Sequence, residues 1–270
     1  MTNELQEKYE RLIRLFREMG SAAVAFSGGV DSSLLLIAAK EALCENMAAL
    51  TGISQTFASK EKKEAEEFCR TFKIRQICFD PNELQVPEYR ENSLQRCYYC
   101  KKTLFQKMLE IAQENSLSFV VEGSNLDDDR DYRPGMKAIQ ELGIRSPLKE
   151  AGLHKEEIRE LSRAMNLPTW NKPSCPCLAS RISYGESIET DKLIRVDKAE
   201  EFLRNLGAGQ LRVRLQGKTA RIEVLPEDFP LIMENKDKIV QAFRFYGFVY
   251  VSLDLAGFRS GSMNEMFVKK

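Results

Sequence analysis

The sequence has little histidine, no long apolar run and no excess of charge of either sign. His154 is the single histidine, which argues against metal sites rich in imidazole and against reactions that need two imidazoles. No stretch approaches the roughly 18 consecutive apolar residues of a membrane span. Forty Lys and Arg balance 40 Asp and Glu, whereas a dedicated nucleic-acid-binding domain is usually strongly basic. We therefore expect neither a membrane nor a nucleic acid as partner.

Cysteine is present seven times, an odd number. The residues after Met1 read TNELQEKYERLIRLF and contain no apolar signal segment. We therefore expect a cytoplasmic protein whose thiols stay reduced and available for metal or redox chemistry. A chain of 270 residues is long enough for one large domain or two smaller ones.

Short apolar runs alternate with amphipathic stretches in the first part of the chain. This alternation predicts βαβ units, and hence an α/β fold in which helices cover both faces of a parallel sheet. The expected strands are 22–26, 47–53, 74–79 and 119–122, and the expected helices are 5–19, 32–44, 59–72, 103–115 and 155–165.

The pattern changes near Trp170, where a loop with prolines and cysteines begins. Two alternating runs beyond it, separated by Gln216-Gly217-Lys218, predict a hairpin. The other elements expected there are helices at about 191–206, 228–235 and 238–246 and a strand at 248–253. We predict a nucleotide-binding domain over 1–170, a cysteine-bearing linker over 171–185 and a small α+β domain over 186–270.

A glycine-rich loop joins the first expected strand to the helix that follows it. Its glycines allow the backbone to approach a phosphate, and the helix N-terminus favours an anion. Its serine hydroxyls are further donors, and Asp31 can hold Mg²⁺ against phosphate oxygens. The alternative is a tight turn capped by serine. The predicted phosphate-binding residues are Ser27, Gly28, Gly29, Val30, Asp31, Ser32 and Ser33.

This loop, SGGVDSS, resembles the PP-loop of the N-type ATP pyrophosphatases. Enzymes of that superfamily cleave ATP between its α and β phosphates. Gly123, Ser124 and Asn125 follow the fourth expected strand, at the carboxyl edge where open α/β sheets bind ligands, and we expect them to contact ATP as well. Asp127 and Arg133 follow within ten residues and are further candidates for this site. The alternative interpretation of the acidic residues there is a solvated surface loop.

The cysteines fall into two groups. Cys44, Cys69 and Cys78 lie in apolar or helical runs, and we expect them to be small core residues. The others form Cys97-Tyr98-Tyr99-Cys100 and Cys175-Pro176-Cys177, which we expect in loops. The spacing leaves several states open: an Fe–S cluster, a structural Zn²⁺ site (for which C-x-C is unusual), a dithiol pair or unliganded thiols.

Arginines alternate along one strand of the predicted hairpin. Arg212 and Arg214 are two residues apart and therefore point to the same face. Guanidinium pairs suit bidentate phosphate binding, and Arg181 and Arg221 are candidates to join them. The alternative is a solvated basic face in which Glu223 pairs with an arginine.

Motifs of both predicted domains resemble one branch of the PP-loop superfamily, the LarE family of ATP-dependent sulfur transferases. The motifs that resemble the family occur in the same order along this chain: RCYYCKKTLF from Arg96, Lys172-Pro173, CLASR from Cys177, Tyr184-Gly185, LRVR from Leu211 and ARIEV from Ala220. It implies ATP-dependent adenylation of a carboxylate of pyridinium-3,5-biscarboxylic acid mononucleotide. Sulfur then replaces AMP, in the assembly of the nickel-pincer nucleotide cofactor of lactate racemase.

The family uses two sulfur sources. One kind sacrifices a single cysteine, which Cys177 resembles, and the other relays sulfide on a [4Fe–4S] cluster held by three cysteines. The presence of Cys97 and Cys100 beside Cys177 favours the cluster type. Cys175 is an extra thiol that could replace Cys177 as ligand or carry a persulfide.

The resemblance also implies other partners. Arg181, Arg212 and Arg214 are expected to bind the substrate phosphate, and sulfide or a persulfide is expected as donor. The C-terminal domain is expected to bind substrate or to form a homo-oligomer. The alternatives are a PP-loop tRNA thiolase, an amidating ligase, and a non-enzymatic nucleotide-binding protein with a structural zinc site made of four cysteines.

Overall fold

A four-stranded parallel sheet forms the centre of the first of two compact units in the computed structural model, which describes residues 2–130 and 134–259. This unit comprises Met1–Val86 and Gln95–Cys175. Its strand order is β3-β2-β1-β4, and the three pairings are parallel, as the βαβ pattern predicts. The strands are β1 (Ala22–Ala25), β2 (Met47–Gly52), β3 (Gln76–Phe79) and β4 (Phe119–Val121).

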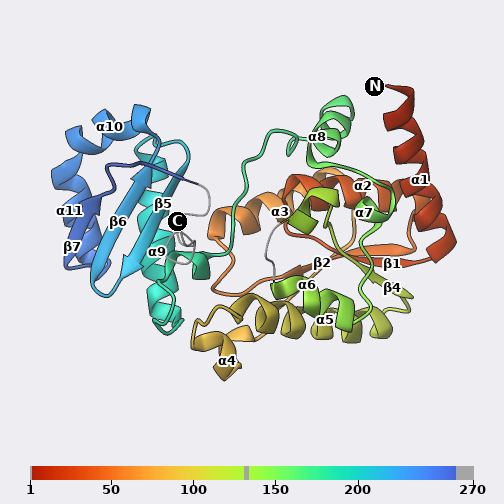
Figure 1. The fold of residues 1–270 in the computed structure, drawn as a ribbon, viewed down its shortest axis with the longest axis horizontal. Helices are drawn as coiled ribbons and strands as arrows, with labels where there is room; N and C mark the ends of the chain where they lie inside the picture. Colours follow the sequence, from red (N-terminus) through yellow and green to blue (C-terminus); the bar gives the residue numbers. More distant parts are fainter. Residues whose placement is uncertain (1, 131–133, 260–270) are drawn as a thin grey trace. The chain divides into compact units, whose positions relative to one another are not determined.

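Helices cover both faces of this sheet (Figure 1). Successive strand residues point to opposite faces, so Val24 belongs to one buried cluster and Ala23 to the other. On the face of Val24 lie α1 (Asn3–Met19), α2 (Val30–Leu43), α3 (Ser59–Thr71), α7 (Pro147–Glu150) and α8 (Lys155–Ala164); on the other lie α5 (Arg96–Glu114) and α6 (Pro134–Glu141). The predicted α/β class is confirmed.

Local signals determine where the first helix begins and ends. The Thr2 hydroxyl accepts a hydrogen bond from the Leu5 N–H at 3.3 Å, so α1 begins at Asn3 rather than at Leu5 as the apolar spacing predicts. It ends at Met19 because Gly20 follows with a φ of +71°, a conformation that favours glycine.

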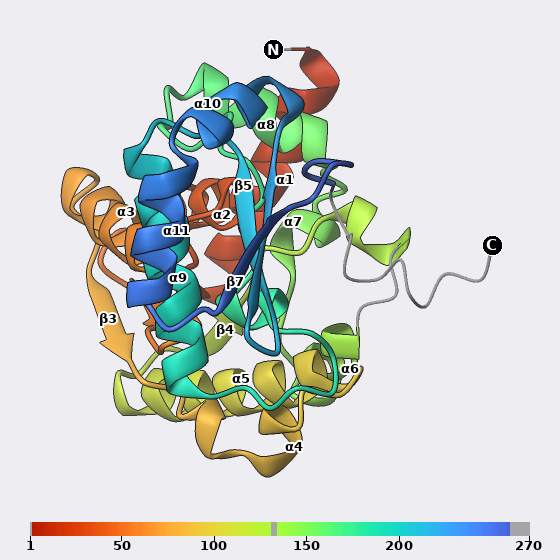
Figure 2. The same cartoon turned by 90° about the vertical axis from the view of Figure 1, so that its left-hand side faces the viewer.

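The second unit comprises Pro87–Leu94 and Pro176–Lys270. Its sheet has the order β5-β6-β7, with β5 and β6 antiparallel and β7 parallel to β6. Helix α9 packs on β5, and α11 packs on α9 and β7 (Figure 2). The elements are η3 (Leu178–Arg181), α9 (Thr190–Asn205), β5 (Leu211–Gln216), β6 (Thr219–Val224), η4 (Pro226–Asp228), α10 (Phe229–Glu234), α11 (Lys236–Phe245) and β7 (Tyr250–Leu253).

A short segment from the middle of the chain belongs to this second unit. It contains α4 (Pro87–Arg90) and is held by Asn92, whose side chain is 0% exposed. The Asn92 amide donates to the carbonyls of Ile182, Ser183 and Glu186 at 3.3, 2.8 and 3.0 Å. One buried amide thus shares its two N–H donors among three backbone carbonyls and anchors the segment.

Several elements differ from the sequence prediction. Helix α5 begins at Arg96, seven residues before the predicted start at Thr103, so the Cys97–Cys100 motif is helical and not in a loop. The prediction did not include α4, α6, α7, η1 (Glu83–Gln85) or η2 (Leu126–Arg130). Within the described residues, every helix is too short or too polar to cross a membrane.

Candidate active site

The glycine-rich loop lies between β1 and α2, at the carboxyl edge of the parallel sheet. Gly28 has a φ of +71°, a left-handed conformation that a residue with a Cβ adopts only at a cost. Gly29 is extended and forms the N-cap of α2. The first N–H groups of α2 lack partners within the helix, so this turn can bind an anion such as a phosphate.

Two serines link the ends of the loop. The Ser32 hydroxyl donates to the Gly29 carbonyl at 3.1 Å and accepts from the Ser27 N–H at 3.4 Å. The hydroxyls of Ser27 and Ser32 lie 3.2 Å apart. Val30 and Ser33 are buried, and the Ser33 hydroxyl has no hydrogen-bond partner within the described residues. These contacts therefore hold the two ends of the loop together before any ligand binds.

The end of β4 closely approaches the same helix N-terminus. A Cβ on Gly123 would lie 3.1 Å from the Ser32 nitrogen, so glycine is the residue that allows this approach. Asn125, two residues on, donates from its amide to Asp31 Oδ1 at 3.1 Å. Two predicted parts of the site, around Asp31 and around Asn125, are thus in direct contact.

A lysine that the sequence prediction missed completes this network. Lys155, the first residue of α8, forms an ion pair with Asp31 Oδ2, and its backbone N–H donates to Asp127 Oδ2 at 2.8 Å. Asp127 also contacts the His154 ring through Nδ1 at 3.0 Å, and its own N–H donates to Asn125 at 2.9 Å. His154 is thus half-buried at the start of α8 and is part of the site's surroundings.

A second lysine contacts the phosphate loop from a distant part of the sequence. Lys172 Nζ donates to the Gly28 carbonyl at 3.0 Å and lies 2.7 Å from carboxylate oxygens of Glu61 and Glu64 on α3. Burial alone would lower the pKa of Lys172, but the two carboxylates outweigh it and raise the pKa above its ordinary value. Lys172 is therefore a charged group beside the loop.

The predicted thiol ligands lie in two different units. Cys97 is exposed and Cys100 partly exposed, and their spacing of three places them on one face of α5. Cys175 and Cys177 are exposed in an irregular segment, the first in one unit and the second in the other. Within the described residues, no three His, Cys, Asp or Glu side chains gather as a metal site. Arg133 lies outside the described residues.

The prediction of three core cysteines is wrong for two of them. Cys69 is buried in α3, and burial raises the pKa of its thiol to about 12, so it is inert. Cys44 is exposed because it follows the last residue of α2. Cys78 is exposed because β3 is an edge strand of the sheet.

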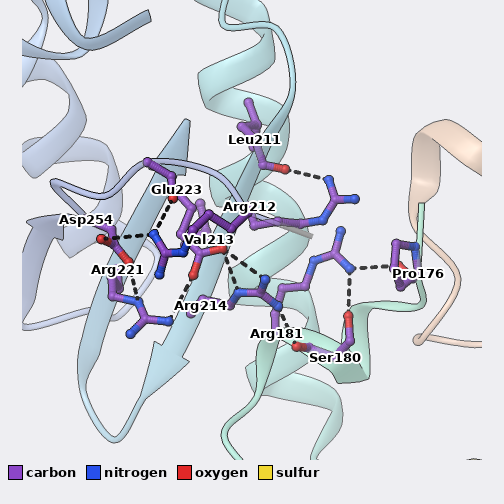
Figure 3. A network of polar contacts seen from close by, with 12 residues as sticks. Pro176, Ser180, Arg181, Leu211, Arg212, Val213, Arg214, Arg221, Glu223 and Asp254 are labelled. Carbon is purple, nitrogen blue, oxygen red and sulfur yellow. Dashed lines mark hydrogen bonds and ion pairs between the residues drawn. The ribbon is translucent and has the colours of Figure 1, made fainter. Parts of the chain in front are cut away.

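Arg181 and Arg214 each form a buried ion pair in the second unit, and Figure 3 shows the polar contacts around them. Arg181, 0% exposed, pairs with Glu200 at 2.9 Å and donates to the carbonyls of Pro176 and Cys177 at 2.7 and 3.2 Å. Burial alone would raise the pKa of Glu200, but Arg181 and Arg204 lower it below its ordinary value. Arg181 thereby orients two successive backbone carbonyls, those of Pro176 and Cys177.

Arg214 lies on β5 beside β6. It pairs with Glu223 at 2.9 Å, and Glu223 also accepts from Arg221 at 2.9 Å (Figure 3). The pairing with Glu223 that the sequence left as an alternative is therefore present. Arg212 donates to the Leu211 carbonyl at 2.6 Å, and its guanidinium lies 5.1 Å from the centre of the Phe258 ring.

The parallel sheet and its glycine loop define an α/β protein of the PP-loop ATP pyrophosphatase class. No family model matches the chain. It is 27% identical to one chain of the glutamine-hydrolysing GMP synthase of Archaeoglobus fulgidus, over 82% of this chain and 78% of that protein, which agrees with the class.

Closer relatives narrow this class to one family. The chain is 35% identical to the pyridinium-3,5-bisthiocarboxylic acid mononucleotide synthase of Lactiplantibacillus plantarum, over 98% of this chain and 96% of that protein. It is 40% identical to an uncharacterized protein of Synechocystis sp., over 98% of this chain and the whole of that protein. Because these matches span both units, the chain belongs to the LarE family, which confirms the resemblance seen in its motifs.

Proposed function

We propose that this protein is an ATP-dependent sulfur transferase that converts a carboxylate of pyridinium-3,5-biscarboxylic acid mononucleotide into a thiocarboxylate. The observation that carries the proposal is the full-length match with the Lactiplantibacillus plantarum enzyme, whose name specifies the bisthiocarboxylic acid mononucleotide. The product would serve the assembly of a nickel-pincer nucleotide. The phosphate loop supports the use of ATP as the activating substrate.

Adenylation is the first proposed step, because a carboxylate oxygen is a poor leaving group. A carboxylate oxygen of the substrate attacks the α-phosphorus of ATP, the bond to the β-phosphate oxygen breaks, and pyrophosphate leaves with the electron pair. Residues 27–33 would bind the phosphates, with N–H groups of the glycine turn and of the first turn of α2 as donors. Asp31 is a hard oxygen ligand that fits Mg²⁺, which would neutralise charge on the leaving pyrophosphate. Gly123, Ser124 and Asn125 would complete the nucleotide site.

Sulfur transfer is the second proposed step. A sulfur nucleophile attacks the acyl carbon, the bond from that carbon to the AMP oxygen breaks, and AMP leaves. Cys97 is exposed, Cys100 is partly exposed and lies one helical turn away, and the two fit adjacent thiolate ligands; we propose Cys177 as the third. A [4Fe–4S] cluster held there would supply an iron that binds the sulfide. Sulfide or a persulfide is the proposed donor, and Cys175 is a candidate carrier or substitute ligand.

Substrate anchoring is assigned to the arginine face of the second unit. We propose that Arg212 and Arg214 bind the 5′-phosphate of the mononucleotide, since two guanidinium groups on one strand face suit a dianion. Arg181 would support them through its bonds to the Cys177 segment, and Glu223 would orient Arg214. A homo-oligomer is the proposed assembly.

The test is a single incubation under anaerobic conditions. The protein is mixed with ATP, Mg²⁺, sulfide and the biscarboxylate mononucleotide, and mass spectrometry measures thiocarboxylate while a coupled assay measures pyrophosphate. We expect Cys177→Ser to release pyrophosphate without forming thiocarboxylate, and Cys44→Ser, a change at an exposed thiol elsewhere, to act as wild type. Thiocarboxylate formation by Cys177→Ser at the wild-type rate would contradict the assignment.

A further inference from the structure

Lys172 is a largely buried ammonium whose three N–H donors meet three acceptors. Its side chain is 14% exposed, and its contacts are the Gly28 carbonyl at 3.0 Å and the carboxylates of Glu61 and Glu64, each at 2.7 Å. An ammonium has three N–H bonds, so this arrangement can satisfy all of them. Replacing it leaves two carboxylates and a loop carbonyl without their shared donor.

The bond to Gly28 controls the direction of a neighbouring N–H. In a trans peptide the carbonyl of one residue and the N–H of the next point in opposite directions. With the Gly28 carbonyl held by Lys172, the Gly29 N–H must point away from Lys172. An ammonium on the carbonyl also polarises the peptide and makes that N–H a stronger donor. Lys172 therefore orients part of the anion-binding turn.

The backbone around Lys172 is linked to α8. Arg159 of α8 donates to the carbonyls of Trp170 and Lys172 at 2.8 and 3.0 Å, on either side of residue 171. Pro173 follows and restricts Lys172 to an extended backbone. Cys175 lies three residues further along, within about 10 Å of extended chain. The segment that carries this thiol therefore starts from a point tied to the phosphate loop.

We propose that Lys172 is a positioning residue that couples the Gly28–Gly29 peptide to the cysteine-bearing segment 173–175. When phosphate engages the turn, the Gly28–Gly29 peptide adjusts, and its carbonyl carries Lys172 and the following residues with it. Cys175 is exposed without nucleotide, so the coupling changes the position and reactivity of its thiol when ATP binds. A role of this change in sulfur transfer rests on the proposed function, whereas the coupling itself needs only nucleotide binding.

The test measures thiol reactivity without turnover. Wild type, Lys172→Met and Lys172→Arg are treated with iodoacetamide, with and without Mg²⁺ and saturating non-hydrolysable ATP analogue, and mass spectrometry follows the Cys175 peptide. We expect nucleotide to change the alkylation rate of wild type by at least about threefold, as for a local opening equilibrium, and to leave the rate in Lys172→Met unchanged. Lys172→Arg, which keeps the charge and donors, should restore the effect.

The matched control is Lys8→Met. Lys8 is also an ion-paired lysine of the first unit, 2.6 Å from Glu157, and it should keep the wild-type response. The coupling is overturned if nucleotide changes the alkylation rate of Cys175 in Lys172→Met as much as in wild type. It is also overturned if nucleotide does not change that rate in wild type. A normal response in a protein that forms no thiocarboxylate would instead reject the proposed function and leave the coupling intact.

Discussion

Lys155 and Asp31 form an ion pair at the N-terminus of α2, where the glycine loop turns into the helix. Asp31 is the side chain proposed to hold Mg²⁺, and Lys155 is a cation next to the phosphate site. We expect Lys155→Met to raise the KM for Mg·ATP roughly tenfold or more, because a hydrogen bond to a charged group contributes about 1.5–3 kcal/mol. Pyrophosphate release at varied ATP measures this. Lys62→Met, at an exposed lysine of α3, is the control, and an unchanged KM in Lys155→Met refutes the prediction.

The two loop glycines differ in backbone conformation and offer a matched pair. Gly28→Ala should destabilise the fold by about 1–2 kcal/mol, because alanine is strained at a φ of +71°. Gly29→Ala should be within about 0.5 kcal/mol of wild type, because Gly29 has an ordinary extended backbone with a φ of −81°. Urea unfolding gives both free energies. Equal effects of the two changes would show that strain at Gly28 is not the cause.

We predict that Glu200 makes the free energy of unfolding depend on pH in the acid range. Its pKa is lowered in the folded protein from the ordinary 4.5, so the folded state gains stability from this group above pH 4.5 and loses it as the pH falls below that value. Glu200→Gln should cost about 3–5 kcal/mol at neutral pH, because Arg181 then lacks its buried partner, and should flatten the acid side of the stability curve.

Urea unfolding between pH 3 and 7 measures both effects, with the exposed neighbour Glu201→Gln as control. If the free energy of unfolding falls with decreasing pH as steeply in Glu200→Gln as in wild type, other carboxylates cause the loss of stability in acid.

We predict that Cys97 and Cys100 of α5 are needed for iron binding. After anaerobic reconstitution, wild type should hold about four irons per chain, whereas Cys97→Ser and Cys100→Ser should each lose most of the iron and the brown absorbance. Cys78→Ser changes an exposed thiol on β3 and should bind iron normally. One zinc and no iron in the wild type would instead support a structural zinc site.

The elements of the fold that could be predicted are those with strong periodicity and clear ends. Thr219–Val224 alternates and is bounded by a turn, and β6 has those same limits. The start of α5 could not be predicted, because the residues from Arg96 to Lys102 have no regular apolar spacing. Gln95, which precedes the helix, makes no side-chain capping bond either.

The site was predictable only where residues form a motif. The glycine loop and Asn125 follow strands that end at one edge, so their proximity follows from the topology. Lys155 is a single lysine far along the chain from the loop, and no spacing connects it to Asp31. Lys172 belongs to the Lys172-Pro173 motif, but nothing in that motif indicates its contact with Gly28. An apolar run likewise does not tell a central strand from an edge strand, which is why Cys78 was misplaced. The ligand roles of the cysteines and of the arginines stay predictions.

The anchoring of Asn92 affects how this protein can be divided. Because residues 87–94 belong to the second unit, the chain passes between units after Val86, after Leu94 and after Cys175. A single proteolytic cut at any one of these points leaves the units covalently joined. A fragment that ends at Cys175 would also lose the three backbone carbonyls to which the buried Asn92 amide donates. The two units are therefore best expressed and studied together as one uninterrupted polypeptide.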